Sequence, residues 1–346
     1  MNKAFTLVEL LAVIAILAII LFIAVPYFMN AVNNSKYSAL AKDEVMMANT
    51  AERYMIKNIS KLPSSIGGTT QVTLSTLVSE NYMNNIISPF DKSVTCDGYV
   101  LITRLTGGDY DYTPYLNCDS ALGNYIDDGL IANIKSDGTA LNFTPNTIAG
   151  AIYGATATIN RFGDSNKAML LDGTDDYIDL GNQTDLVLNT GGTISTWIYL
   201  NSWNGTNYST TVICRSNGAS WNSLYYDIFK LAGVNYLILT ISDGTNSLQG
   251  NGPKTGVLSL NTWYNITATW DSTTKCMYVN GTQSQCVSST VMPSTNTTAT
   301  SVSVGKSGPS NTYYFNGNVD DIKIYNRALT ATEIKTNYSL DKLRSY

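Results

Sequence analysis

The stretch AFTLVELLAVIAILAIILFIAVPYF, residues 4–28, decides how this 346-residue chain is organised. Its apolar length is about what a bilayer-spanning helix needs, and Glu9 is its one charged residue. A secretory signal peptide has a shorter apolar core followed by a small-residue cleavage site. This run instead ends at Pro26 with no A-x-A site after it. The stretch therefore predicts a membrane helix to which the rest of the chain is attached.

Glu9 is the unusual residue of that helix. A carboxylate within hydrocarbon costs roughly 2.5–3.5 kcal/mol on insertion scales, so a plain membrane anchor avoids one. An opposite charge on a neighbouring chain can offset the cost. Pro26 removes a backbone donor and predicts a kink or an unwound segment.

Residues 3–26, KAFTLVELLAVIAILAIILFIAVP, closely resemble the N-terminus of type IV pilins and of type II secretion pseudopilins. The resemblance implies that a prepilin peptidase cuts between Ala4 and Phe5, which leaves residues 1–4 as the leader and a methylated Phe5 amine. The family usually has Gly where this chain has Ala4. It further implies that Glu9 pairs with a neighbouring subunit's N-terminal ammonium and sets the register of assembly.

Composition limits the possible functions of the remaining chain. Charged residues make up 14%, the net charge is −5 and no basic block occurs, which argues against nucleic-acid binding. The 23 tyrosines and five cysteines favour a β-rich protein outside the cell. The absence of histidine excludes Ser-His-Asp and Cys-His catalysis and His-ligated metals.

The segment 29–118 predicts a pilin head, in which the long helix packs on a small antiparallel sheet. Apolar residues at near-helical spacing predict that the helix continues to about Asn58: Leu40, Met47, Ala51, Met55, Ile59 and Leu62. Residues 74–83 predict a short strand or helix that covers it.

The stretch 96–118, CDGYVLITRLTGGDYDYTPYLNC, alternates apolar and polar residues on both sides of Gly107-Gly108, which predicts a hairpin. It resembles the sheet of Gram-positive pilin heads. Cys96 and Cys118 lie near opposite ends of the two strands, so they either form a disulfide or remain two buried thiols; an oxidising exterior favours the disulfide.

From residue 129 onward, short alternating strands separated by Gly, Asn, Asp and Ser turns predict an antiparallel sandwich. The junction 119–128 has no Pro- or Ser-rich linker, which predicts closely coupled modules. Segments 129–340 closely resemble the laminin-G-like, concanavalin A-like jelly roll, and five stretches carry the resemblance: RFGDSNKAMLLDGTDDYIDLG (161–181), TISTWIYL (193–200), WYNITATWD (263–271), YVNG (278–281) and FNGNVDDIKIYNRALTATEI (315–334).

The jelly-roll resemblance also implies a structural calcium site, because Asp172 in LDG and Asp320 in VDD match positions that the family associates with a cation. Hard oxygen ligands suit calcium, while the alternative is a pair of solvated turn aspartates. Some relatives of the fold are glycosidases, which need two carboxylates. No Glu occurs between Glu80 and Glu333, and the Asp175-Asp176 pair is typical of a polar turn, so we expect no catalysis.

Aromatic residues in Gly/Asn/Ser-rich stretches predict loops that contact a ligand: Trp203, Tyr208, Trp221, Tyr225, Tyr313 and Tyr314. Any one of these rings could instead cap the sandwich edge. Trp197, Trp263 and Trp270 alternate within strands and are expected in the core. Replacing a loop ring should leave stability nearly unchanged.

Cys276 and Cys286 flank Asn280-Gly281, a strong hairpin signal, and are expected to form a second disulfide. Cys214 is then the odd cysteine, expected as a small buried hydrophobe.

Taken with the resemblances, the sequence predicts a minor type IV pilin or tip adhesin, whose lectin-like module binds a glycan or surface protein. The alternatives are a structural minor pilin that primes or caps the filament, and a pseudopilin of a secretion system. The expected partners are other pilin subunits and the prepilin peptidase. The expected location is the cytoplasmic membrane before assembly and the extracellular pilus after it.

Overall fold

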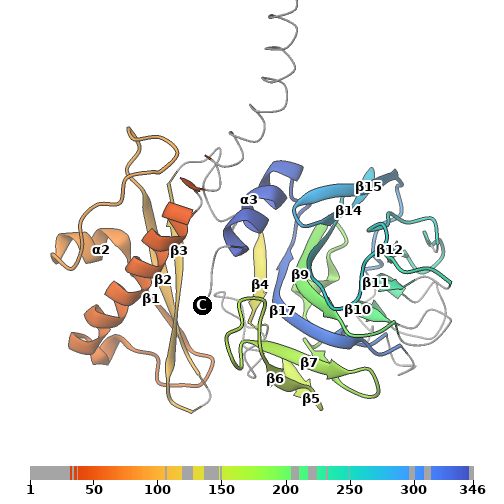
Figure 1. Ribbon diagram of the computed structural model, residues 1–346, viewed down its shortest axis with the longest axis horizontal. Coiled ribbons are helices and arrows are strands. Elements are labelled where there is room, and N and C mark those ends of the chain that lie inside the picture. The colour runs from red at the N-terminus through yellow and green to blue at the C-terminus, as the bar shows by residue number, and fades with distance from the viewer. Residues whose placement is uncertain are drawn as a thin grey trace, which may run out of the picture.

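The computed structural model describes residues 32, 35–36, 38–105, 107–118, 128–135, 148, 150–203, 210–216, 224–230, 233–248, 250–295, 301–307 and 313–342. No helix in these ranges is long and apolar enough to cross a membrane. The predicted membrane segment, with Ala4, Phe5, Glu9 and Pro26, lies outside them. The described part consists of a head, residues 38–118, and a two-sheet sandwich, residues 128–342 (Figure 1).

The head places one helix against a three-stranded antiparallel sheet of order β1-β2-β3 (Figure 1). The helix ends at residue 57, as predicted. After a single 3-10 turn at Ile59–Lys61, the elements are β1 (Thr69–Thr73), α2 (Leu74–Ser79), β2 (Asp97–Arg104) and β3 (Tyr110–Asn117). Gly107 and Gly108 both have positive φ between β2 and β3, the conformation that a tight hairpin turn requires.

The head core follows from the helical spacing of its apolar residues. Leu40, Met47, Ala51 and Met55 lie one or two turns apart and are buried against the sheet. Ile59, by contrast, is 69% exposed, because the helix has already ended and the stripe no longer faces the sheet. The predicted apolar stripe is therefore confirmed as far as the helix extends.

The sandwich consists, within the described residues, of a six-stranded and an eight-stranded sheet. The six-stranded sheet has the order β12-β11-β10-β16-β8-β5, with bounds Leu237–Ile241, Leu224–Lys230, Thr211–Ser216, Val302–Val304, Tyr177–Asp179 and Ala151–Tyr153. The other sheet has the order β15-β14-β13-β9-β17-β7-β6, with bounds Thr282–Ser288, Thr274–Val279, Trp263–Trp270, Gly192–Leu200, Asn316–Tyr325, Ala168–Asp172 and Thr156–Thr158, and β4 (Leu130–Ile134) also pairs with β17.

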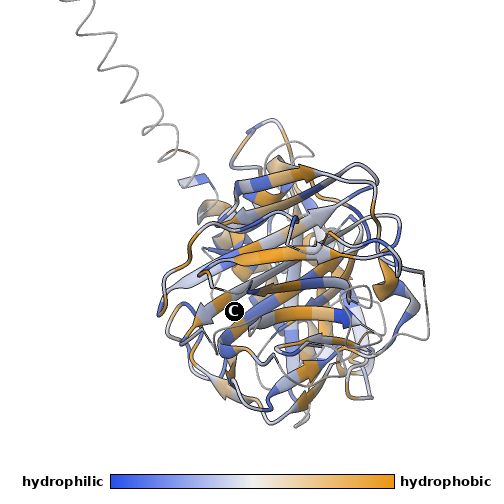
Figure 2. Ribbon diagram, turned by 90° about the vertical axis from the view of Figure 1, so that its right-hand side faces the viewer, coloured by the Kyte–Doolittle hydropathy of each residue, from blue (hydrophilic) through white to orange (hydrophobic). Residues whose placement is uncertain are grey.

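Alternation along the strands builds the sandwich core. Every second residue points between the sheets, and Figure 2 shows hydrophobic and hydrophilic residues in turn along the strands. Trp270 and Tyr226 are fully buried there. Trp270 Nε1 donates to the Leu188 carbonyl at 3.0 Å, and the Tyr226 hydroxyl donates to the Leu186 carbonyl at 3.0 Å. The polar atom of each buried ring therefore has a hydrogen-bond acceptor, as buried Trp and Tyr usually require.

Trp270 and Trp197 are buried as expected, but the expectation for Trp263 was wrong. Trp197 is buried on the opposite face of β9, where its ring stacks on Tyr338 of α3 (Ala331–Asp341) at 5.6 Å. Trp263 is half-buried beside Tyr199. Alternation predicts which face of the sheet a strand tryptophan lies on. Whether the ring is buried there depends on what covers that face, and α3 covers Trp197.

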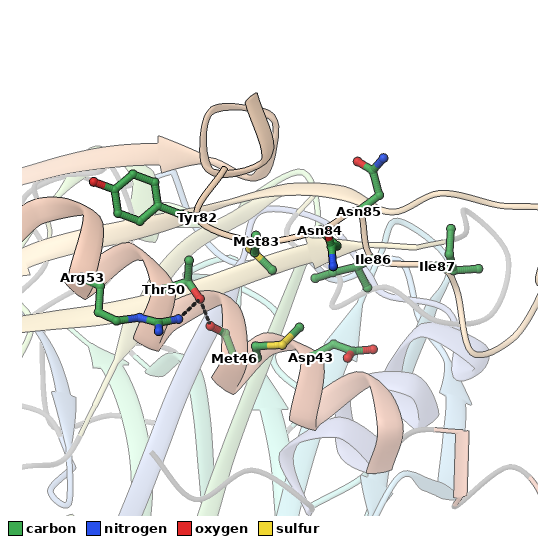
Figure 3. Close-up of a pocket in the computed structure, with 10 residues that line it drawn as sticks. All are labelled: Asp43, Met46, Thr50, Arg53, Tyr82, Met83, Asn84, Asn85, Ile86 and Ile87. Carbon is green, nitrogen blue, oxygen red and sulfur yellow. Dashed lines mark hydrogen bonds between the residues drawn. The ribbon is translucent and has the colours of Figure 1, made fainter. Parts of the chain in front are cut away.

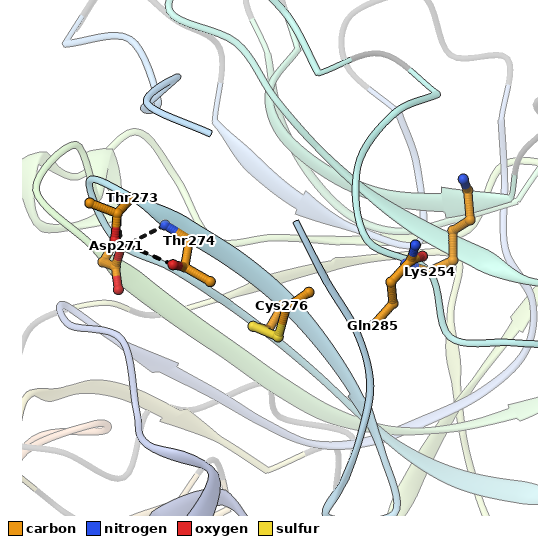
Figure 4. Close-up of a disulfide and its surroundings, with 7 residues drawn as sticks. Lys254, Asp271, Thr273, Thr274, Cys276 and Gln285 are labelled. Atoms are coloured by element: carbon orange, nitrogen blue, oxygen red, sulfur yellow. Dashed lines mark hydrogen bonds between the residues drawn. A yellow bond between two sulfur atoms is a disulfide. The ribbon is translucent and has the colours of Figure 1, made fainter. Parts of the chain in front are cut away.

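Both predicted disulfides are present. Cys96–Cys118 joins the two ends of the head hairpin, and Cys276–Cys286 joins residues directly opposite each other on β14 and β15. Figure 4 shows Cys276 with its surroundings, including Gln285, whose Oε1 accepts from the Lys254 amide at 3.0 Å. Cys214 is buried and lies outside both disulfides.

Candidate functional site

Three carboxylates gather in the turn between β7 and β8. Asp172, Asp175 and Asp176 each offer an oxygen, and these oxygens lie within 4.8 Å of one another. Asp172 Oδ1 accepts from the Thr174 amide at 2.7 Å, and Asp176 Oδ2 accepts from the Asp172 amide at 2.9 Å. These backbone bonds fold the turn so that its acidic side chains converge.

The electrostatics of this acidic turn suit a cation. Burial raises the pKa of the Asp176 carboxyl, and the neighbouring charges of Asp172 and Asp175 raise it further. The hydrogen bond from the Asp172 amide lowers this pKa and offsets part of the rise. Among the described residues no Lys or Arg lies within ion-pair distance of the three. Clustered hard oxygens of like charge are the donor set that calcium takes, so the residues fit such an ion.

Asp320 does not belong to this cluster, so the predicted ligand pair Asp172/Asp320 is wrong. In the register of β17 against β7, Asn316 lies opposite Asp172, and Asp320 is four residues further along, about 13 Å away at the rise of a strand. Its carboxylate instead bonds to Arg161, which also bonds Asp321 Oδ2 at 2.8 Å. Asp320 is therefore held in an ion pair with a guanidinium.

An aromatic platform lies on the outer face of the six-stranded sheet, at the edge formed by β5 and β8. Tyr153 and Tyr177 are directly opposite in register, and their rings stack at 4.5 Å with an interplanar angle of 7°. They face outward because the adjacent pair on the same two strands, Ile152 and Ile178, packs toward the core. Tyr153 is 46% exposed, so the platform presents aromatic surface to solvent.

The platform is continuous with the acidic turn. Lys306 Nζ lies 3.3 Å from the centroid of the Tyr177 ring. Burial raises the pKa of Tyr314, and the nearby Asp175 and Tyr177 raise it further. At Gly154, a Cβ would lie 1.9 Å from Asp176 Oδ1, so the turn that follows Tyr153, between β5 and β6, rests against the acidic turn.

The predicted ligand aromatics have different positions. Tyr313 and Tyr314 are half-buried just before β17, and Tyr314 lies at the platform. Trp203 packs partly against the sandwich core, with Lys230 Nζ 5.9 Å from its ring centroid, so it is not the exposed loop ring that was expected. Tyr225 is likewise not in a loop, since it is buried in β11 under Arg215. Tyr208 and Trp221 lie outside the described residues.

A hollow lies on the head, far from the platform along the chain. Its volume is ≈ 370 Å³, and Asp43, Met46 and Arg53 of the helix line one side while residues 82–87 line the other (Figure 3). On the helix, Thr50 Oγ1 donates to the Met46 carbonyl at 2.7 Å and accepts from the Arg53 guanidinium at 3.1 Å. None of the predicted ligand residues lines it.

Two family models match the chain. Residues 1–25 match the prokaryotic N-terminal methylation motif, and residues 172–335 match the concanavalin A-like lectin/glucanases superfamily. The chain joins a type IV pilin signal to a concanavalin A-like jelly roll. The match to the jelly roll begins at Asp172, so β4, β5 and β6 extend its two sheets before the matched region.

Several solved structures are similar to part of this chain at low identity. Domain 4 of AbnA, an extracellular arabinanase of Geobacillus stearothermophilus, is 18% identical over 61% of this chain and 98% of its own, with a TM-score of 0.48. The binding domain of botulinum neurotoxin DC, solved with rat synaptotagmin II, is 16% identical over 64% of this chain and 53% of its own, with a TM-score of 0.45. Trypanosoma rangeli sialidase is 11% identical over 71% of this chain and 43% of its own, with a TM-score of 0.47. A search of curated protein sequences finds no match.

Proposed function

We propose that this protein is a minor type IV pilin, with residues 29–118 as its pilin head, whose jelly roll binds carbohydrate at the platform of Tyr153 and Tyr177. The observation that carries the binding proposal is the stacked, solvent-facing ring pair beside polar and charged groups, since sugar rings stack on exposed aromatic faces. The N-terminal motif supports processing by prepilin peptidase, a membrane-held subunit before assembly and a place among other pilins afterwards.

Binding in this proposal does not involve catalysis. The jelly roll holds no histidine and no glutamate before Glu333, and the platform is flanked by Lys306 and turn aspartates rather than by a facing pair of carboxylates. A structural pilin that primes or caps the filament, or a pseudopilin, would show no saccharide binding.

Replacing Tyr153 with Ala should weaken binding to a glycan array about fivefold, because its exposed ring contributes roughly 1 kcal/mol of stacking, whereas the Tyr177 ring is covered by Tyr153 and Lys306. The melting temperature should change little, since Tyr153 is exposed. The matched control is Tyr99→Ala, which breaks a stacked tyrosine pair in the head, where Tyr99 and Tyr115 lie 4.9 Å apart. If wild type binds and the platform variant binds equally well, the site lies elsewhere on the molecule.

We also propose that the acidic turn binds calcium and stabilises the turn between β5 and β6 that lies against it. Calcium at a concentration a hundred times its dissociation constant should add about 2.7 kcal/mol to the free energy of unfolding, and Asp172→Asn with Asp175→Asn should remove this gain. Differential scanning fluorimetry with calcium, magnesium or chelator measures the effect. Asp271→Asn, in another exposed strand-end turn, is the control and should keep the full calcium shift; a double variant that also keeps it would exclude the acidic turn as the site.

A further inference from the structure

The head and the sandwich meet along a buried apolar contact. Leu340, near the end of α3, is fully buried and belongs to the hydrophobic core of the head rather than to that of the sandwich. Leu130, the first residue of β4, packs both against the head core and against the small cluster under α3 that contains Tyr325, Leu329 and Ile334. Figure 1 shows α3 and β4 between the two modules. A side chain supplied by the last helix therefore completes the core of the first module.

A salt bridge reinforces this contact. Lys135, directly after β4, donates to both oxygens of Asp111 on β3 of the head, at 3.0 and 3.1 Å. Both side chains are largely shielded from solvent, at 10% and 16% exposure. Thr113 Oγ1 also donates to Asp111 at 2.6 Å, which fixes the carboxylate, so the pair is better ordered than an exposed surface bridge.

The residue next to Leu340 fastens α3 to the sandwich. Lys323 of β17 donates to both carboxylate oxygens of Asp341 at 2.7 Å. Arg161 donates to the Asp341 carbonyl at 2.9 Å while it bonds Asp320 and Asp321. Two consecutive residues of α3 thus contact different modules. Leu340 packs in the core of the head, and Asp341 forms an ion pair with the sandwich.

We propose that α3 and β4 couple the two modules noncovalently, so that a load on the jelly roll reaches the head through α3 as well as through the covalent junction at 119–127. The coupling rests on Leu340, Leu130 and the Lys135–Asp111 pair. It fixes the orientation of the jelly roll on the head, and it does not depend on which ligand the platform binds.

The test uses the full chain, folded in detergent, with a protease site placed between residues 121 and 126. After cutting, the wild-type fragments should co-elute in size-exclusion chromatography at the volume of the uncut chain. Leu340→Ala should release them as two peaks. The control, Leu329→Ala, creates a similar cavity in the cluster beneath α3 on the sandwich side and should still co-elute.

A charge exchange tests the polar part without leaving a cavity. Lys135→Asp should weaken fragment association at least about tenfold, the equivalent of 1.4 kcal/mol, and adding Asp111→Lys should restore most of it. Cut wild-type fragments that separate at once would overturn the proposal. So would release by Leu329→Ala equal to that by Leu340→Ala, or a charge exchange that fails to restore association.

Discussion

Replacing Arg161 with Leu is expected to lower the free energy of unfolding by about 3–5 kcal/mol, the range for removing one partner of a buried ion pair. Arg161 bonds Asp320, Asp321 and the Asp341 carbonyl, and its own side chain is only 6% exposed. Without it, two adjacent carboxylates on β17 remain buried beside each other. Urea denaturation followed by fluorescence measures the loss.

The control is Arg327→Leu, because Arg327 also bonds two acidic residues, Asp128 and Glu333, but its side chain is 29% exposed. Exposed pairs are worth about 1 kcal/mol or less. Equal losses in the two variants would contradict the importance that we assign to burial.

The pH dependence gives the same experiment a second readout. Arg161, Lys323 and Lys135 lower the pKa of Asp321 to about 2 despite its burial. A depressed carboxyl pKa contributes stability that is present above its ordinary value near 3.8 and is lost as the pH falls toward 2. The Arg161 variant should therefore show less of this acid-dependent loss than wild type between these two values.

Glu9→Leu is expected to leave membrane insertion intact while reducing incorporation into filaments at least about tenfold, a factor that corresponds to 1.4 kcal/mol. The reason is that Glu9 has no counter-charge within its own apolar segment, and we propose that it pairs with the N-terminal amine of the next subunit. Immunoblots of sheared filaments and of membranes separate assembly from insertion.

The matched control is Glu52→Leu, which removes an exposed carboxylate from the helix of the head. Its filament fraction should equal that of wild type. Normal incorporation of the Glu9 variant would refute the pairing, and loss of both variants from the membrane fraction would show that the chain is degraded before assembly.

The sequence predicted the features that depend on neighbours in the chain. Met47 and Ala51 are buried because their spacing follows the helix, and the cysteines of each hairpin meet because a short turn sets the strand register. Local pattern was sufficient for both disulfides and for the alternation that builds the sandwich.

Features that depend on distant partners were missed or misassigned. Asp320 resembled a calcium ligand, but Arg161, 159 residues away, occupies its carboxylate. Tyr153 and Tyr177 come from strands of only three residues, too short for alternation to show, so nothing local indicated that their rings stack. Trp203 lies in a loop-like stretch yet packs on the core, because composition does not indicate which surface a segment covers.

The burial of Cys214 has a consequence for how the subunit matures. Its thiol lies on β10 opposite Asp227, which it hydrogen-bonds, and 1% of the residue is exposed. In the unfolded chain all five thiols compete during oxidation, and Cys214 lies in sequence between the two native pairs. Thiol–disulfide exchange needs an accessible thiolate, so pairing of β10 with β11 and β16 withdraws the odd cysteine from that competition. Formation of the six-stranded sheet therefore protects the correct disulfide pattern while the chain folds.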